Sequence, residues 1–204
     1  KNFSAILSAH YTYRIKPQIR LSYQLDPQDP TSFDYYTINT DSGYSYGLES
    51  SFKFIINKYI SIYENISINK TNLSPFIYLN DKVIGDRSFA HAPEILMYGG
   101  LSLSFLNISI NLSHNYTSSF YYDEQNNFKS NPYNILDGEL KYEKNGFIVS
   151  IFVKNIFDTI YTTRGYYFSL EPPLLEEDTL IYDQKLYTIF GNPRELGFGV
   201  SFNF

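Results

Sequence analysis

The chain has 204 residues, a formal net charge of −5, no Cys, no Trp, 21 Tyr and 17 Phe. The negative charge argues against a nucleic-acid partner, which needs a basic surface, and the absence of Cys excludes disulfides and thiolate metal sites. No stretch approaches the ~20 consecutive apolar residues of a membrane-spanning helix. The distribution of the apolar residues therefore has to indicate the class of protein.

The first long segment alternates between apolar and polar residues. Most odd positions from Ala5 to Leu25 are apolar and most even positions are polar. Such alternation predicts a strand with one apolar face. A soluble strand usually runs about 5–6 residues, so this length favours a barrel strand that crosses a bilayer and projects beyond it.

The same period of two recurs to the end of the chain, and helical periodicity is not sustained anywhere. About ten strands are predicted, and they start near Ser4, Phe33, Tyr46, Tyr59, Ile95, Ile108, Tyr133, Phe147, Thr159 and Glu195. Tight turns are expected at Leu106-Asn107 and Lys144-Asn145-Gly146, and long loops over Asp26–Ser32 and Glu171–Asn192. Glu64 breaks an apolar row, and the sequence gives no reason for it.

This pattern predicts an all-β fold, an antiparallel transmembrane β-barrel. Inside a bilayer every backbone donor and acceptor must be satisfied within the protein, so a sheet has to close. The lipid face is then apolar and the lumen face polar, with Tyr near both interfaces. A soluble β-sandwich is the alternative, but its core would have to absorb these long rows of Tyr, Phe and Ile.

Several segments resemble the end of a TonB-dependent outer-membrane receptor, in family order and spacing. The stretch Val153–Tyr161 resembles the V-x-N-L-F-D-x-x-Y turn, with Ile156 in place of the usual Leu, and Pro193–Gly197 resembles the P-R-x-x-G opening of the last strand. Asp41–Glu49 resembles a recurrent strand start, and Ala92–Glu94 resembles a periplasmic turn.

The resemblance implies that residues 1–204 are the C-terminal portion of a barrel of 22 strands, whose N-terminal plug domain, TonB box and first strands lie outside this sequence. It also implies outer-membrane lipid, the TonB complex and the barrel-assembly machinery as partners, and an iron–siderophore complex or a similar scarce compound as ligand. The assembly signal would be the alternating C-terminal residues Phe198, Val200, Phe202 and Phe204.

Strand parity and the resemblance together give an expected orientation. If Phe204 lies at the periplasmic end, Asp26–Ser32 and Glu171–Asn192 are extracellular and Asn155–Asp158 is a periplasmic turn. Within that turn Asn155, Phe157 and Asp158 are expected to be structural, because Asn and Asp side chains hydrogen-bond nearby backbone groups.

Ligand-binding candidates border the long acidic loop at the expected extracellular mouth. They are Arg164, Tyr166, Tyr167 and Tyr187, whose side chains can pair with or stack on an anionic ligand; a girdle of interfacial Tyr is the other reading of Tyr166 and Tyr167. The acidic run from Glu171 to Asp178 suits either a cation contact or solvation.

No catalytic constellation is visible, so no enzyme, metal site or cofactor is predicted. His10, His91 and His114 are far apart and have no partner at metal-ligand spacing. The leading hypothesis is TonB-driven uptake of a scarce ligand. A passive porin-like channel and a truncated, non-functional receptor remnant remain as alternatives.

Overall fold

The computed structural model describes residues 2–26, 28–29, 31–78, 82–125, 128–168, 174–176, 179–181 and 185–203. Every regular element of this part is a strand. The strands are β1 (Phe3–Ile15), β2 (Gln18–Gln24), β3 (Phe33–Asn39), β4 (Ser42–Asn57), β5 (Ile60–Leu73), β6 (Phe76–Tyr78), β7 (Lys82–Ile84), β8 (Ile95–Phe105), β9 (Ile108–Thr117), β10 (Tyr133–Lys144), β11 (Phe147–Lys154), β12 (Thr162–Phe168), β13 (Leu174–Glu176), β14 (Thr179–Ile181), β15 (Lys185–Phe190) and β16 (Glu195–Phe202).

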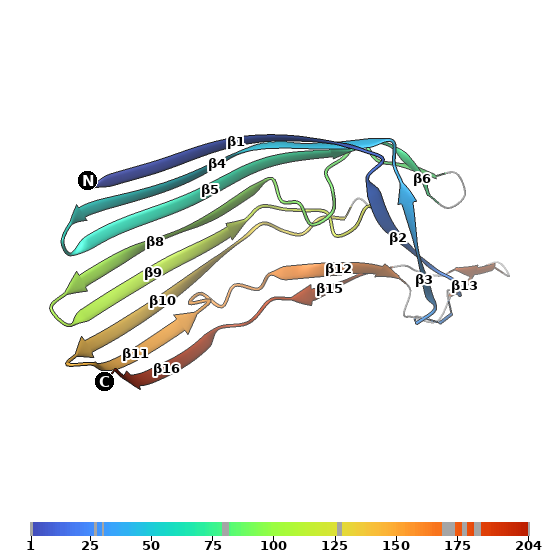
Figure 1. The fold of residues 1–204 in the computed structure, drawn as a ribbon. Coiled ribbons are helices and arrows are strands. Elements are labelled where there is room, and N and C mark those ends of the chain that lie inside the picture. The colour runs from blue at the N-terminus through green and yellow to red at the C-terminus, as the bar shows by residue number, and fades with distance from the viewer. Residues whose placement is uncertain are drawn as a thin grey trace.

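Eight of these strands form one antiparallel sheet in the order β1-β4-β5-β8-β9-β10-β11-β16 (Figure 1). An unbroken ladder pairs β1 with β4, from Phe3 opposite Phe54 to Ile15 opposite Ser42. The predicted all-β, antiparallel class is confirmed. The sheet is open, because β1 and β16 are its two edges. Among the described residues, no helix is long and apolar enough to span a membrane.

The two ends of this sheet differ. One end, here the turn end, carries both termini and the tight connections at 57–60, 105–108 and 144–147 (Figure 1). Asn145 and Gly146 both have positive φ, as a type I′ hairpin requires. The opposite end, here the loop end, carries the long connections. The turns predicted at Leu106-Asn107 and Lys144–Gly146 are confirmed.

Neither of the two predicted periplasmic turns lies at the turn end. Because Phe147 pairs with Phe202 and Lys154 pairs with Glu195, β11 runs away from the turn end. Asn155–Asp158 therefore lies on the loop-end side, opposite to the expected periplasmic position. Ala92–Glu94 precedes β8, which runs from the loop end to the turn end. This segment therefore lies at the loop end, and its predicted periplasmic position is also wrong. The placement of Asn155–Asp158 failed because interrupted strands were counted as separate crossings, and that of Ala92–Glu94 failed because it followed from a short motif resemblance.

The interruptions have a physical cause. Lys16 has φ 50° and Pro17 lacks a backbone donor, so the segment Ala5–Leu25, predicted as one strand, divides into β1 and β2. Opposite this break, Thr40 and Asp41 separate β3 from β4. The strand starts predicted at Phe33 and Tyr46 thus belong to one interrupted strand, and so do those at Phe147 and Thr159.

The region predicted as a loop over Glu171–Asn192 is not wholly irregular. It contains β13, β14 and the hairpin strand β15, which pairs with β12. Asp26–Ser32 is a connection as predicted, and its Asp26 and Asp29 carboxylates accept hydrogen bonds from the amides two residues on, at 2.9 and 2.8 Å.

One face of the eight-stranded sheet is mostly apolar. The register places Leu112 opposite Leu101, Leu140 opposite Ile110 and Ile151, and Phe198 opposite Ile151. Leu140 is 47% exposed and Phe198 is 81% exposed. An apolar face of this extent is expected of a barrel wall in lipid, because soluble monomers rarely expose such large patches.

The buried core lies elsewhere, at the loop end. It consists of Ile19, Leu21, Leu73, Phe76 and Ile84, with Leu21 and Leu73 fully buried. Ile19 and Leu21 are on β2, Leu73 is the last residue of β5, Phe76 is on β6 and Ile84 is on β7. We call this assembly, together with residues 118–125 that pack on it, the loop-end cap. In Figure 1 β2 and β3 turn away from the direction of β1 and β4.

Candidate functional site

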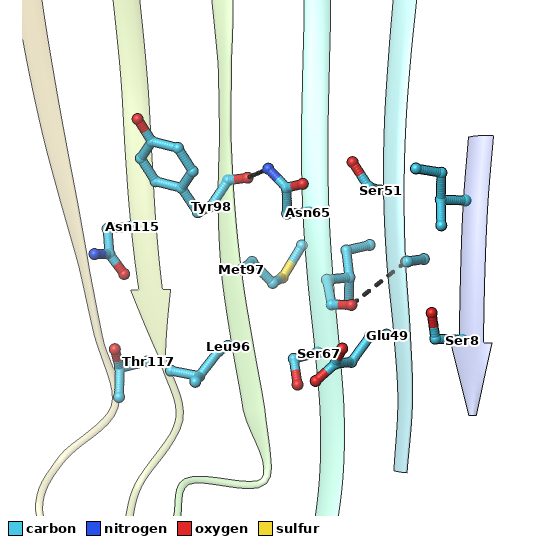
Figure 2. Close-up of a pocket in the computed structure, with 13 residues that line it drawn as sticks. Ser8, Glu49, Ser51, Asn65, Ser67, Leu96, Met97, Tyr98, Asn115 and Thr117 are labelled. Atoms are coloured by element: carbon cyan, nitrogen blue, oxygen red, sulfur yellow. Dashed lines mark hydrogen bonds between the residues drawn. The ribbon is translucent and has the colours of Figure 1, made fainter. Parts of the chain in front are cut away.

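A cavity of about 540 Å³ is lined mainly by residues of the polar face of the sheet, although its Ser50, Ile66 and Met97 belong by alternation to the other face. Figure 2 shows hydroxyl and amide side chains from neighbouring strands directed into it. Its lining residues are Ile6, Ser8, Glu49, Ser50, Ser51, Asn65, Ile66, Ser67, Leu96, Met97, Tyr98, Asn115 and Thr117. Glu49 is the one carboxylate in this lining, so the surface offers mainly neutral hydrogen-bonding groups.

Alternation along the strands positions these polar groups. Asn65 and Ser67 flank Ile66 on β5, and the Asn65 Nδ2 donates to the Tyr98 carbonyl oxygen at 3.1 Å (Figure 2). On the same face, the His10 Nε2 lies 3.3 Å from the Asn69 Oδ1. The polar face is thus suited to hydrogen-bonding a polypeptide or a polar ligand held inside the barrel wall.

The loop-end cap ties distant parts of the chain together through Gln125. Its Oε1 accepts from the Ser22 amide and hydroxyl, both at 3.4 Å, and its Nε2 donates to the Ser22 carbonyl. The Tyr78 hydroxyl donates to that same carbonyl at 2.7 Å. Gln125 is buried, so these hydrogen bonds hold the β2–β3 hairpin against the 118–125 segment.

A charged cluster extends this contact. The side chain of Arg87 is 7% exposed; its Nη2 donates to the Asp123 carbonyl at 2.8 Å, and its guanidinium lies 4.5 Å from the Tyr121 ring centroid. The Glu124 Oε1 accepts from the Ala90 amide at 3.0 Å. Burial raises the pKa of Glu124 above its ordinary value and lowers the pKa of Arg87, which the nearby Asp123 and Glu124 carboxylates partly offset.

This cluster could not be predicted from the sequence. Arg87 and Asp123 are separated by 36 residues and Ser22 and Gln125 by 103, and neither 85–94 nor 118–132 shows a regular pattern. Only the folded chain brings these side chains together.

The four residues predicted to bind ligand fall on both faces of one hairpin. Tyr166 on β12 is directly opposite Tyr187 on β15, and Arg164 lies two residues before Tyr166 on the same face. Tyr167 faces the other way and stacks on Phe128, with ring centroids 4.8 Å apart. None of the four lines the cavity of the polar face. Of the acidic run, Glu171, Glu177 and Asp178 lie outside the described residues.

Asn155 is the joint between β11 and β12. It is 3% exposed and has φ 50°. Its Oδ1 accepts from the Thr159 amide at 2.8 Å, and its Nδ2 donates to the carbonyls of Thr159 and Asn192 at 3.0 and 3.1 Å. Its own amide donates to the Asp137 Oδ1 at 2.8 Å. One amide side chain therefore closes the bend and links it to the returning strand.

Asp158 connects the same bend to the start of β16. It has φ 52°, and its Oδ1 accepts from the Arg194 amide at 2.8 Å. Phe157 between them is 74% exposed.

The alternating C-terminal residues lie on the apolar face. Phe198, Val200 and Phe202 are opposite Ile151, Val149 and Phe147, on the neighbouring strand β11. Their exposed fractions are 81%, 62% and 52%. Phe204 lies outside the described residues.

The three His residues have separate environments. His10 is on the polar face, the His91 ring packs 5.5 Å from that of Phe120, and His114 pairs with Glu64. Within the described part of the chain, no three His, Cys, Asp or Glu side chains are grouped so that they could hold a metal ion.

An open antiparallel wall with one apolar and one polar face defines a segment of a membrane β-barrel, and comparison with solved structures agrees. The chain is similar to the siderophore receptor PiuA from Acinetobacter baumannii, with 14% identity, a TM-score of 0.69 and 98% of this chain covered. The copper transporter OprC is 16% identical, with a TM-score of 0.72 and 100% of this chain covered. The ferric yersiniabactin uptake receptor FyuA from Yersinia pestis is 15% identical, with a TM-score of 0.63 and 100% of this chain covered.

These matches cover 26%, 30% and 35% of PiuA, OprC and FyuA. The chain thus spans about a third of these receptors or less. No family model matches the sequence and no curated protein does. The chain has the fold of part of a TonB-dependent receptor barrel, and the resemblance seen in its motifs is confirmed at the level of the fold.

Proposed function

We propose that this chain is the C-terminal barrel wall of an outer-membrane receptor that imports a scarce ligand with energy supplied through TonB. The observation that carries the proposal is the likeness along the whole chain to solved uptake receptors, whose names state siderophore, ferric-complex or copper cargo. A likeness to receptors rather than enzymes supports transport and not catalysis.

The open edges support a larger assembly. Unpaired backbone groups on β1 and β16 cannot face hydrocarbon, so the wall needs further strands to close. In a wide barrel the polar face lines the lumen. Its Ser and Asn side chains would then hydrogen-bond the plug domain that the family resemblance implies.

The loop end is the extracellular mouth in this proposal. Arg164, Tyr166 and Tyr187, which share one face of the β12–β15 hairpin, are its candidate contacts to an anionic metal complex, because guanidinium groups pair with carboxylate and aromatic rings stack on planar ligands. Tyr167 is a weaker candidate, since its ring already stacks on Phe128.

The direct test is uptake by the complete gene product in cells that lack their own receptors. Radiolabelled ferric complexes are supplied with and without a functional TonB. Uptake above the level of the empty vector that disappears without TonB is the expected result. Uptake that is independent of TonB, with conductance in planar bilayers, would instead identify a passive channel.

A second readout separates a receptor from a remnant. The genomic sequence upstream of the codon for Lys1 should encode, in frame, a plug domain, a TonB box and the remaining strands of a barrel of ~22 strands. A stop codon or an unrelated gene there would contradict the transport proposal.

A further inference from the structure

Two ionisable side chains interrupt the apolar face at one point. Glu64 on β5 lies in line with Ile62 and Ile66, and His114 on β9 lies in line with Leu112 and Tyr116. Ionisable residues that face lipid are rare and costly, and this pair accounts for the break that the sequence left unexplained.

The two side chains meet across an intervening strand. β8 separates β5 from β9, and its Gly99 is opposite Glu64 on one side and opposite His114 on the other. Neighbouring strands lie ~4.8 Å apart, so residues two strands away normally have a side chain between them. Here the Glu64 Oε2 lies 3.0 Å from the His114 Nε2.

Gly99 makes that contact possible. A Cβ at this position would lie 2.0 Å from the Glu64 Oε2 and 2.6 Å from its Cδ. The carboxyl group therefore occupies the space above the glycine, and any larger residue would separate Glu64 from His114. Both side chains are about a quarter exposed, at 27% for Glu64 and 26% for His114.

The surroundings leave each group dependent on the other. Phe52 is opposite Glu64 on β4, and Leu136 is opposite His114 on β10. The Glu64 Oε1 is buried and has no hydrogen-bond partner among the described residues. If the pair separates, a carboxyl group and an imidazole remain in hydrocarbon without their hydrogen bond. Losing that bond in hydrocarbon costs more free energy than losing it in water, where water molecules would replace the partner.

Only one register satisfies the pair. A slip of one residue sends a strand's side chains to the other face. A slip of two residues between β8 and β9 places His114 opposite Met97 or Leu101 instead of Gly99, and those side chains would fill the gap. On most of the rest of this face apolar residues follow one another at every second position, with exceptions such as Ser50 and Gly138, so apolar packing discriminates weakly between such slipped registers.

We propose that Glu64, Gly99 and His114 form a polar lock that fixes the register of β5, β8 and β9 during insertion into the membrane. A single buried polar contact is a known means of specifying register at a cost in stability. The lock acts on assembly, whatever ligand the protein carries.

The test uses cross-strand cysteines in the complete gene product, in membranes, because this segment has no Cys of its own. Leu101→Cys with Leu112→Cys reports the native register, in which these residues are opposite. Leu103→Cys with Leu112→Cys reports a slip of two residues on the same face. Each pair is oxidised with and without Glu64→Leu plus His114→Leu, which replaces the lock by side chains that suit lipid.

The expected result is that the slipped cross-link rises about tenfold in the double leucine variant, while Glu64→Gln keeps the native product because its amide can still bond the imidazole. Gly99→Ala, which leaves both ionisable groups in place, should raise the slipped product as well. A double leucine variant that inserts normally and gives only the native cross-link would overturn the proposal.

Discussion

The barrel wall and the loop-end cap use the same apolar residue types in opposite ways. On the wall, Leu140 and Phe198 are exposed and form a surface for lipid, whereas in the cap Leu21 and Leu73 are fully buried by other protein atoms. The exposed apolar face of the wall suits a bilayer, whereas the cap has a small buried core of its own. Exposure of a hydrophobic residue therefore carries a different meaning in each region.

The largest effect is expected in the cap. Leu73→Ala should destabilise it by about 2–5 kcal/mol, because the residue is fully buried in the cap core and its truncation leaves a cavity. Hydrogen exchange of the β2–β3 amides measures the change. Ile77→Ala, at an exposed neighbour, is the control and should change exchange little. Equal effects of the two variants would contradict a packed cap.

A charge on the wall should have the next largest effect. Leu112→Arg places a guanidinium on the apolar face and should cost about 2–4 kcal/mol near the membrane midplane. Ser113→Arg, one residue on, faces the polar side and is opposite Asp137, so it should insert normally. Heat-modifiable migration of the folded barrel compares the two. Similar insertion of both variants would show that the faces are not distinguished by lipid.

The Asn155 joint should respond less strongly. Asn155→Ala removes one acceptor and two donated hydrogen bonds that serve backbone groups, and should cost about 1–3 kcal/mol. Asn155→Asp keeps the acceptor for the Thr159 amide but sets a buried carboxylate oxygen against the carbonyls of Thr159 and Asn192, so it should destabilise the bend at least as much as alanine does. Denaturant titration of the folded barrel ranks the three proteins. An alanine variant as stable as the parent protein would contradict the claim that the Asn155 side chain stabilises the bend.

The smallest effect concerns pH. Because burial raises the pKa of Glu124 above its ordinary value of 4.5, its contribution to the cap is fully present below that value and is lost as pH rises through the raised pKa. Exchange of the Ala90 amide, corrected for intrinsic rates, should therefore report a cap that opens more readily with rising pH. Glu124→Gln should flatten this profile, and identical profiles would contradict the burial of the carboxyl group.

The wall could be predicted from the sequence because each of its residues obeys a local rule. Alternation alone placed Phe198, Val200 and Phe202 on one face, and the Asn-Gly pair at 145–146 located a hairpin. The strand count was harder to predict, because Lys16-Pro17 and Asn155–Tyr161 interrupt strands without ending the crossing.

The cap and the polar lock could not be predicted in this way. Gln125 hydrogen-bonds to Ser22, which is 103 residues away in the sequence, and Glu64 pairs with His114, which is 50 residues away. Such contacts depend on register and on the bend of the β2–β3 hairpin, and neither is encoded in a local pattern. One member of the polar lock was visible in the sequence, because Glu64 interrupts an otherwise apolar row.

The central claim is that the two faces of this sheet meet different solvents, and nitroxide labels at single cysteines from Ile108 to Ser113 on β9 test it most directly. The complete gene product is labelled in membranes, and collision rates with oxygen and with a water-soluble nickel chelate are compared. If one face meets lipid, oxygen access varies with a period of two and is greatest at Ile108, Ile110 and Leu112 and lower at the residues between. Uniform access to the nickel chelate along these positions would contradict a barrel wall in lipid.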